Sequence, residues 1–98
     1  MRREPKVLES HIKEQVKDYL AFKGIFNFPI TQGLGSYRGA PDRVLHLNGR
    51  VVYLEIKTPT GKLSEYQERF EDQCYDDGIS YWLIRSIEDL ERLMEASC

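Results

Sequence analysis

Two acidic side chains and a lysine occupy positions from which they can act together. In the segment 42–57, two apolar runs flank the dipeptide Asn-Gly at 48–49, which favours a type I′ turn and hence a β-hairpin. In the register set by this turn, Asp42 lies directly opposite Glu55 on one face of the hairpin, with Cβ atoms about 4.5–5.5 Å apart. Lys57 is two residues beyond Glu55, so it projects from the same face.

Two carboxylates at that separation repel each other, so a purely structural protein gains little from them. A divalent cation reverses the sign of that interaction. Hard ions such as Mg²⁺ and Mn²⁺ bind oxygen ligands from one or two carboxylates, and water or a substrate phosphate completes the shell. The alternative is an ordinary salt bridge between Glu55 and Lys57 on an exposed sheet edge.

Composition limits the class of protein. The 98 residues are 41% apolar and 31% charged, which is typical of one small globular domain, and no apolar run is long enough to span a membrane. The two cysteines are too few for a disulfide framework or a four-cysteine zinc site, and they fit a reducing cytoplasm.

The net charge of −2 hides an uneven distribution of charge along the chain. Residues 1–63 carry eleven basic and six acidic side chains, whereas residues 64–98 carry three basic and ten acidic ones. Because the local field decides whether a polyanion docks, the first two thirds of the chain can face phosphates while the acidic end points away.

The periodicity of apolar residues predicts the elements that position these groups. Gly24 and Gly78 are expected to end the first and second helices, Pro29 marks an edge strand, and a Gly-rich loop covers 31–41. A helix between the hairpin and the last strand favours a right-handed crossover, so we expect an α/β fold with a mixed sheet flanked by helices. The expected order is helix 7–23, strand 25–30, strands 42–47 and 50–57, helix 64–77, strand 80–84 and helix 86–95.

The sequence around these residues resembles a known nuclease family. Gly39-Ala40-Pro41-Asp42, followed after twelve residues by Glu55-Ile56-Lys57, is similar to the PD-(D/E)xK nuclease core. The continuation Gly61-Lys62-Leu63-Ser64-Glu65-Tyr66-Gln67 resembles that of virus-type replication-repair nuclease (VRR-NUC) domains, of the stand-alone type encoded by phages and bacteria. The resemblance covers nearly the whole chain. It implies a restriction-endonuclease-like αβββαβ core and one nuclease domain over residues 1–98.

The resemblance implies metal-dependent hydrolysis of DNA phosphodiester bonds, with Mg²⁺ or Mn²⁺ and no organic cofactor. Asp42, Glu55 and the backbone carbonyl of Ile56 would hold the ion, and Lys57 would orient or help deprotonate the attacking water. The residues expected to contact DNA are Tyr37, Arg38, Arg43, Lys62 and Ser64.

Two further site residues have alternative interpretations. The family carries a glutamate on the first helix, and Glu9 continues the apolar, inward stripe whereas Glu14 is expected to face solvent. Glu9 is otherwise a favourable charge in a first helical turn. Gln67 either completes a capping box with Ser64 or lies beside the metal, as the resemblance implies, and both roles are compatible.

The expected function is a structure-selective endonuclease acting on branched DNA in recombination or repair, with the four-way (Holliday) junction favoured by family analogy. The alternatives are a flap- or nick-directed nuclease, a DNA-binding module with a vestigial metal site, and an interaction domain that uses the acidic C-terminal helices. A junction needs two symmetric cuts, so we expect a homodimer, with Ile25, Phe26 and Phe28 as candidate contacts. The expected location is the cytoplasm of a bacterial or phage-infected cell.

Overall fold

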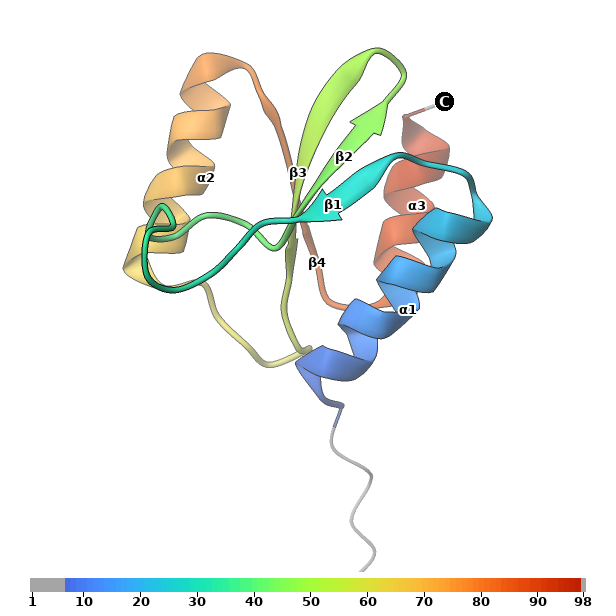
Figure 1. Cartoon of the computed structure of the whole chain (residues 1–98), viewed down its shortest axis with the longest axis horizontal. Coiled ribbons are helices and arrows are strands. Elements are labelled where there is room, and N and C mark those ends of the chain that lie inside the picture. Colours follow the sequence, from blue (N-terminus) through green and yellow to red (C-terminus); the bar gives the residue numbers. More distant parts are fainter. Residues whose placement is uncertain (1–6, 98) are drawn as a thin grey trace, which may run out of the picture.

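A computed structural model describes residues 7–97 of the chain. It confirms the predicted order of helices and strands (Figure 1). None of the described helices has both the length and the apolar character needed to cross a membrane. The elements are α1 (Glu9–Phe22), β1 (Asn27–Pro29), β2 (Arg43–Leu47), β3 (Arg50–Ile56), α2 (Glu65–Asp77), β4 (Ser80–Ile84) and α3 (Ile87–Ala96).

The β2–β3 hairpin has the register that the sequence predicts. Asn48 and Gly49 both have positive φ angles, 52° and 78°, as a type I′ turn requires. Leu47 pairs with Arg50, and the ladder continues without a slip to the pair Arg43 and Leu54. The backbone N–H of Asp42 then donates to the carbonyl of Leu54 over 3.0 Å, so Asp42 extends the ladder beside Glu55.

The four strands form one mixed sheet in the order β1-β2-β3-β4. β1 and β2 pair antiparallel, as do β2 and β3, whereas β3 and β4 are parallel and are joined through α2. Figure 1 shows α2 on one face of the sheet and α1 with α3 on the other. The mixed sheet between helices is therefore confirmed.

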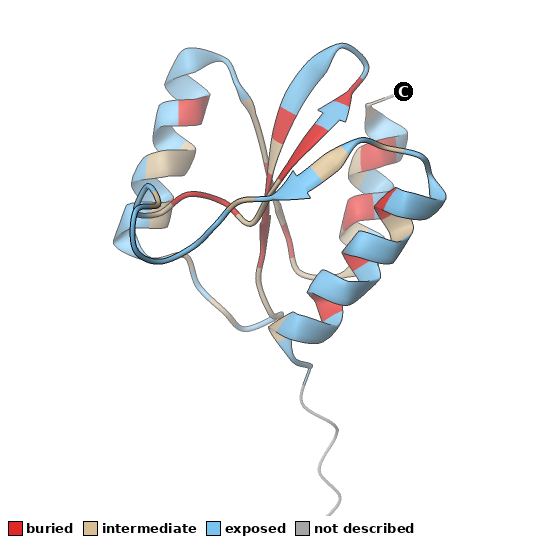
Figure 2. Ribbon diagram, viewed as in Figure 1, coloured by how far each residue is buried: buried red, intermediate tan, exposed pale blue. Residues whose placement is uncertain are grey.

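The main core lies between the sheet and the pair α1 and α3, and its members alternate along the strands. Figure 2 shows buried residues on the sheet and on α1 and α3. Cys74 of α2 is buried as well. The members of the core cluster are Ile12, Val16, Leu20, Leu45, Leu47, Val52, Leu54, Ile56, Trp82, Ile84, Leu90 and Met94.

The strand β1 is shorter than predicted. The sequence predicts residues 25–30, whereas regular pairing covers only Asn27–Pro29. Single backbone hydrogen bonds from Ile30 to the Asp42 carbonyl and from His46 to the Phe26 carbonyl extend its contact with β2 at both ends. The strand lies at the sheet edge, where Pro29, which has no N–H, removes no ladder hydrogen bond from the interior.

The loop between β1 and β2 is fixed against the first turn of α2 by Gly39. This glycine has φ +89°, and a Cβ atom built on it would lie 2.4 Å from the carbonyl oxygen of Tyr66. Only glycine allows the two backbones to approach this closely. The contact ties the segment that leads into Asp42 to the helix that carries Gln67.

Replacement of Gly39 by alanine is therefore expected to cost more stability than the same change at Gly35. Both glycines have positive φ, but the Cβ at Gly35 would meet nothing within 4 Å. We expect Gly39→Ala to lower the free energy of unfolding by about 1–3 kcal/mol more than Gly35→Ala, because backbone must move. Urea unfolding of both variants measures this, and equal losses would contradict the account.

Candidate active site

Glu55 is a carboxylate inside the protein. It lies near the end of β3, on the face covered by α2, and is only 2% exposed. Its Oε1 accepts a hydrogen bond from Nε2 of Gln67 over 3.2 Å, and Nζ of Lys57 lies 3.9 Å from the same oxygen. Its Oε2 is buried with no hydrogen-bond partner among the described residues. A buried carboxylate oxygen without a partner is costly, which marks this position as one retained for a purpose other than stability.

Asp42 precedes β2 and is held on both of its oxygens. Oδ2 accepts a hydrogen bond of 2.7 Å from the backbone N–H of Ile56, and Oδ1 lies 3.3 Å from Nζ of Lys13. Lys13 in turn lies 3.1 Å from a carboxylate oxygen of Glu9. Glu9 in the first turn of α1 thus adds a third carboxylate to the site, and Lys13 in the next turn adds an ammonium group.

The pKa values of Glu55 and Lys13 are both raised, each for a different reason. Burial raises the pKa of Glu55 to about 8, and the charge of Asp42 adds to this increase while Lys57 opposes it. Desolvation lowers the pKa of Lys13, but the charges of Asp42 and Glu9 more than offset it, so its pKa is raised. Glu55 therefore holds a proton near neutral pH, whereas Lys13 stays charged.

Gln67 completes the capping box predicted from the sequence, and its side chain also contacts a carboxylate of the candidate site. Ser64 caps α2 by accepting from the Gln67 backbone N–H over 3.2 Å, and the Gln67 Oε1 accepts from the Ser64 N–H over 2.8 Å. This capping box leaves the Nε2 of the same amide free to donate to Glu55. The start of α2 therefore fixes the side chain that orients the buried carboxylate.

The structure places Glu9, rather than Glu14, near the carboxylates of the candidate site. Glu9 pairs with Lys13 beside Asp42, and its charge contributes to the pKa of Glu55. Glu14 lies on the exposed side of α1. The inward stripe of α1, with Ile12 and Val16 buried, brings Glu9 to the sheet end, as the periodicity predicts.

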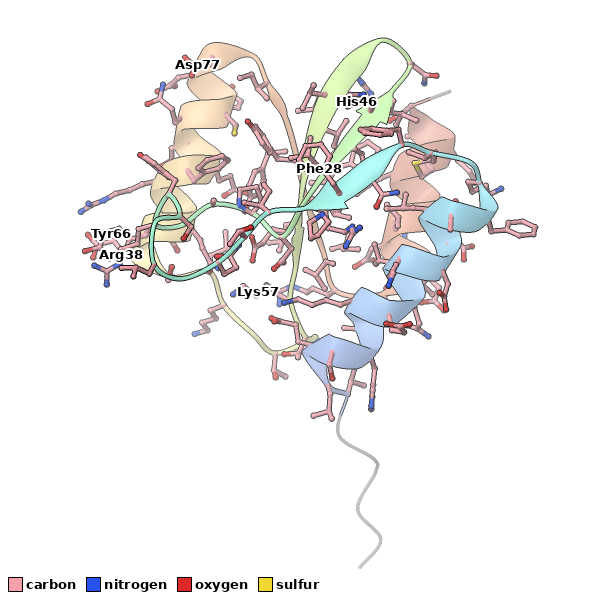
Figure 3. All side chains as sticks on the ribbon, in the orientation of Figure 1. Phe28, Arg38, His46, Lys57, Tyr66 and Asp77 are labelled. Atoms are coloured by element: carbon pink, nitrogen blue, oxygen red, sulfur yellow. The ribbon has the colours of Figure 1, made fainter. Side chains whose placement is uncertain are left out.

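Lys57 lies in the space between the start of α1 and the segment that follows β3 (Figure 3). Its backbone N–H donates to the Ile84 carbonyl over 3.0 Å, which extends the β3–β4 ladder by one residue. Arg85 then holds the following turn, because its guanidinium donates to the carbonyls of Thr58 and Gly61. Hydrogen bonds thus hold both the backbone of Lys57 and the turn that follows it.

Tyr81 is a further buried polar group on the face of Glu55. Its hydroxyl is the other buried side-chain oxygen with no hydrogen-bond partner in the described part of the chain. Burial raises the pKa of Tyr81, and the charge of Glu55 raises it further. The hydroxyl therefore remains protonated and is available as a donor on the Glu55 side of the sheet.

The residues expected to contact DNA have different environments. Tyr37, Arg38 and Lys62 are exposed, the first two on the loop that leads to Asp42. Arg43 is half-buried and donates from Nε and Nη2 to the Asn27 side chain over 3.0 and 2.7 Å, so it ties β2 to β1. Ser64 is exposed but its side chain serves the α2 cap.

Sequence reasoning missed Lys13, Tyr81 and Arg85. The sequence does indicate Lys13, because it lies four residues after Glu9 and therefore on the same side of the helix. Tyr81 looks like an ordinary strand residue in the sequence, and Arg85 acts on carbonyls 24 and 27 residues away in the chain. Contacts of that kind leave no local pattern.

The site fits a small divalent cation. The described residues hold no group of three or more His, Cys, Asp or Glu side chains that could bind an ion together. Mg²⁺ does not need one, because it keeps several waters and binds through one or two carboxylates plus substrate oxygens. Asp42 and the Oε2 of Glu55, which has no hydrogen-bond partner among the described residues, offer carboxylate oxygens, and the carbonyl of Ile56 is the further ligand that the family resemblance implies.

A comparison with solved structures found a protein with a similar fold. A structure titled "VRR_NUC domain" superimposes with a TM-score of 0.75 and 21% sequence identity, over 89% of this chain and 94% of that one. Neither the family models nor the curated proteins gave a match. The likeness confirms the restriction-endonuclease-like VRR-NUC fold that the sequence resemblance implies.

The raised pKa of Glu55 predicts how the stability of the metal-free protein depends on pH. The folded state keeps this proton up to about pH 8, whereas the unfolded chain releases it near the ordinary value of 4.5. Stability from this group is therefore fully present below pH 4.5 and is lost as the pH rises to about 8. In EDTA, unfolding free energies between pH 5 and 8 should fall more for the natural protein than for Glu55→Gln. Parallel curves for the two would contradict the burial of this charge.

Proposed function

We propose that the chain is a Mg²⁺- or Mn²⁺-dependent DNA endonuclease with Asp42, Glu55 and Lys57 at its centre. The observation that carries this proposal is the buried Glu55, which has one oxygen without a partner while Asp42 and Lys57 lie beside it. A protein that needed only stability would gain from an apolar residue here. The VRR-NUC fold supports the proposal.

Each side chain of the site has a task in phosphodiester hydrolysis. When bound, the cation would polarise the phosphoryl group and lower the pKa of water. Lys57 orients the attacking water and offsets charge that develops on the phosphorus oxygens. Gln67 holds the Glu55 carboxylate in place, and Lys13 with Glu9 holds Asp42.

An intact set of side chains favours catalysis over a vestigial binding module. The two carboxylates, the lysine and the glutamine all meet on one side of the sheet end, and none is diverted to a distant partner. A module that only binds DNA has no use for a buried carboxyl group with an oxygen that lacks a partner.

The proposed substrate is branched DNA, with the four-way junction first, and the proposed setting is recombination or repair in the cytoplasm of a bacterial or phage-infected cell. A domain with one site makes one cut, and two symmetric cuts need two copies. Exposed aromatic side chains on the sheet support the proposal of a second copy. Phe26 and Phe28 are 62% and 43% exposed, and Phe26 contacts Phe28 and His46 with ring centroids 6.1 and 4.7 Å apart.

This aromatic edge lies on the part of the sheet face that α2 leaves uncovered, since α2 packs against β4 at the opposite edge. Figure 3 shows Phe28 and His46 there. Ile25 differs from the two phenylalanines because it packs against the main core. It is therefore no longer a candidate for the interface.

Loss of either central charge should abolish cleavage. Glu55→Gln and Lys57→Ala are each expected to reduce the rate of cutting in Mg²⁺ by roughly 100-fold or more, because transition-state stabilisation is lost. Binding of the same DNA in EDTA should persist. Lys17→Ala, on the exposed side of α1, is the control. Cutting of branched DNA by either variant at the natural rate would refute the assignment.

Binding of a cation should stabilise the protein through Asp42. Mn²⁺ is expected to raise the melting temperature by mass action, and Asp42→Asn should reduce that rise. Lys13→Met should enlarge it, because the ammonium 3.3 Å from Asp42 no longer competes for the same oxygen. Lys17→Met is the matched control. An equal rise in the natural protein and in Asp42→Asn would place the ion elsewhere.

Light scattering tests whether the protein is a dimer in solution. We expect twice the 11.5 kDa mass of the chain, and Phe28→Glu should shift the protein toward monomer. Phe22→Glu is a control at an exposed phenylalanine on α1, on the other side of the sheet. A monomer that stays monomeric on a four-way junction would favour flap or nick cleavage instead.

A further inference from the structure

A hollow lies between the 31–41 loop and the first turns of α2. Its volume is about 550 Å³, within the range of pockets that hold small organic ligands. Figure 3 shows Arg38 and Tyr66 together at this place. We call it the tyrosine cleft; it is lined by Tyr37, Arg38, Tyr66, Arg69, Phe70 and Gln73.

The cleft offers aromatic surface on a firm support. Tyr37 is 74% exposed although its ring rests on Phe70 in an edge contact, with centroids 6.1 Å apart. Phe70 in turn packs edge-on against Tyr53 of the sheet at 5.2 Å and against Tyr81 at 6.2 Å. A ring that is exposed yet supported from below presents a surface for stacking at little cost in entropy.

The cleft also carries positive charge. The Arg38 guanidinium lies 3.8 Å from the ring centroid of Tyr66, and that of Arg69 lies 5.5 Å from the same centroid. Arg69 pairs with Glu65, whereas Arg38 forms no ion pair with any of residues 7–97. Arg38 therefore has a charge available for an anion, and its planar group is already held on a ring.

The two walls of the cleft are the two segments that carry the site. Tyr66 precedes Gln67, whose amide donates to Glu55, and Gly39 packs its backbone on Tyr66. The loop continues from Gly39 directly to Asp42. The cleft and the carboxylates are thus positioned by the same two backbone segments.

We propose that the tyrosine cleft binds an unpaired nucleotide of the DNA strand, with its base stacked on Tyr37 and its phosphate on Arg38. This inference rests on the proposed nuclease function and specifies its substrate. In a duplex each base is covered on both faces by its neighbours, so only edges and phosphates can be reached. Aromatic rings beside a cation are the means by which proteins hold unstacked bases. Among branched DNAs, this inference favours those with unpaired nucleotides, such as a flap, over a fully paired four-way junction.

Binding without cleavage tests the proposal. Fluorescence anisotropy in EDTA compares a blunt duplex with the same duplex carrying a short single-stranded flap. The natural protein should bind the flapped DNA more tightly. Tyr37→Ala should lose roughly 5- to 100-fold in affinity for it with little change for the duplex, Arg38→Ala should also weaken flap binding, and Tyr37→Phe should retain the preference. Tyr75→Ala removes a tyrosine of α2 that is 86% exposed outside the cleft, and it should leave binding unchanged.

A second readout follows the base itself. A 2-aminopurine in the flap should lose fluorescence on binding the natural protein and remain bright with Tyr37→Ala, provided that circular dichroism shows both folded. Equal affinity of the natural protein for flapped and blunt DNA, or an unchanged preference in Tyr37→Ala, would overturn the cleft proposal even if Mg²⁺-dependent cutting is observed. A flap preference that depends on Tyr37, without cutting of any DNA, would support the cleft and refute the nuclease.

Discussion

The carboxyl group of Glu55 is removed from water at the end of a central strand, and the surrounding structure is arranged to accommodate it. Burial raises its pKa to about 8, and the neighbouring Asp42 adds repulsion. Gln67 and Lys57 compensate one oxygen and leave the other without a partner. Such a group costs stability unless something positive is supplied, which supports the proposal that the site binds a cation.

The elements around this carboxyl have separate tasks. The hairpin turn sets which residue faces Glu55, and the capping box of α2 sets the amide that binds it. Near its start, α1 adds Lys13, whose ammonium group pairs with Asp42. Gly39 joins the loop before Asp42 to the start of α2, so the carboxylates and the tyrosine cleft share one backbone support. In the proposed nuclease, substrate selection and chemistry are therefore linked through the contact of Gly39 with Tyr66.

Much of this arrangement follows from short-range patterns. Asn48 and Gly49 determine a turn whose geometry fixes pairing up to Asp42, and Ser64 with Gln67 determines where α2 begins. These constraints act within a few residues and leave a signature in the sequence. The inward position of Glu9 also follows, because helical periodicity gives its direction.

The contacts that could not be predicted join distant elements. Arg85 donates to carbonyls of the turn after Lys57. The hydroxyl of Tyr81 is buried without a hydrogen-bond partner because α2 covers this face of the sheet, and no local pattern in the sequence indicates this. The cleft needs the loop and the helix in place before its rings meet.

Diffraction at the manganese edge from crystals soaked in Mn²⁺ tests most directly the central claim that Asp42 and Glu55 bind a cation. An anomalous peak in contact with both Asp42 and Glu55 is the predicted result, and a peak elsewhere or none at these carboxylates would contradict the account.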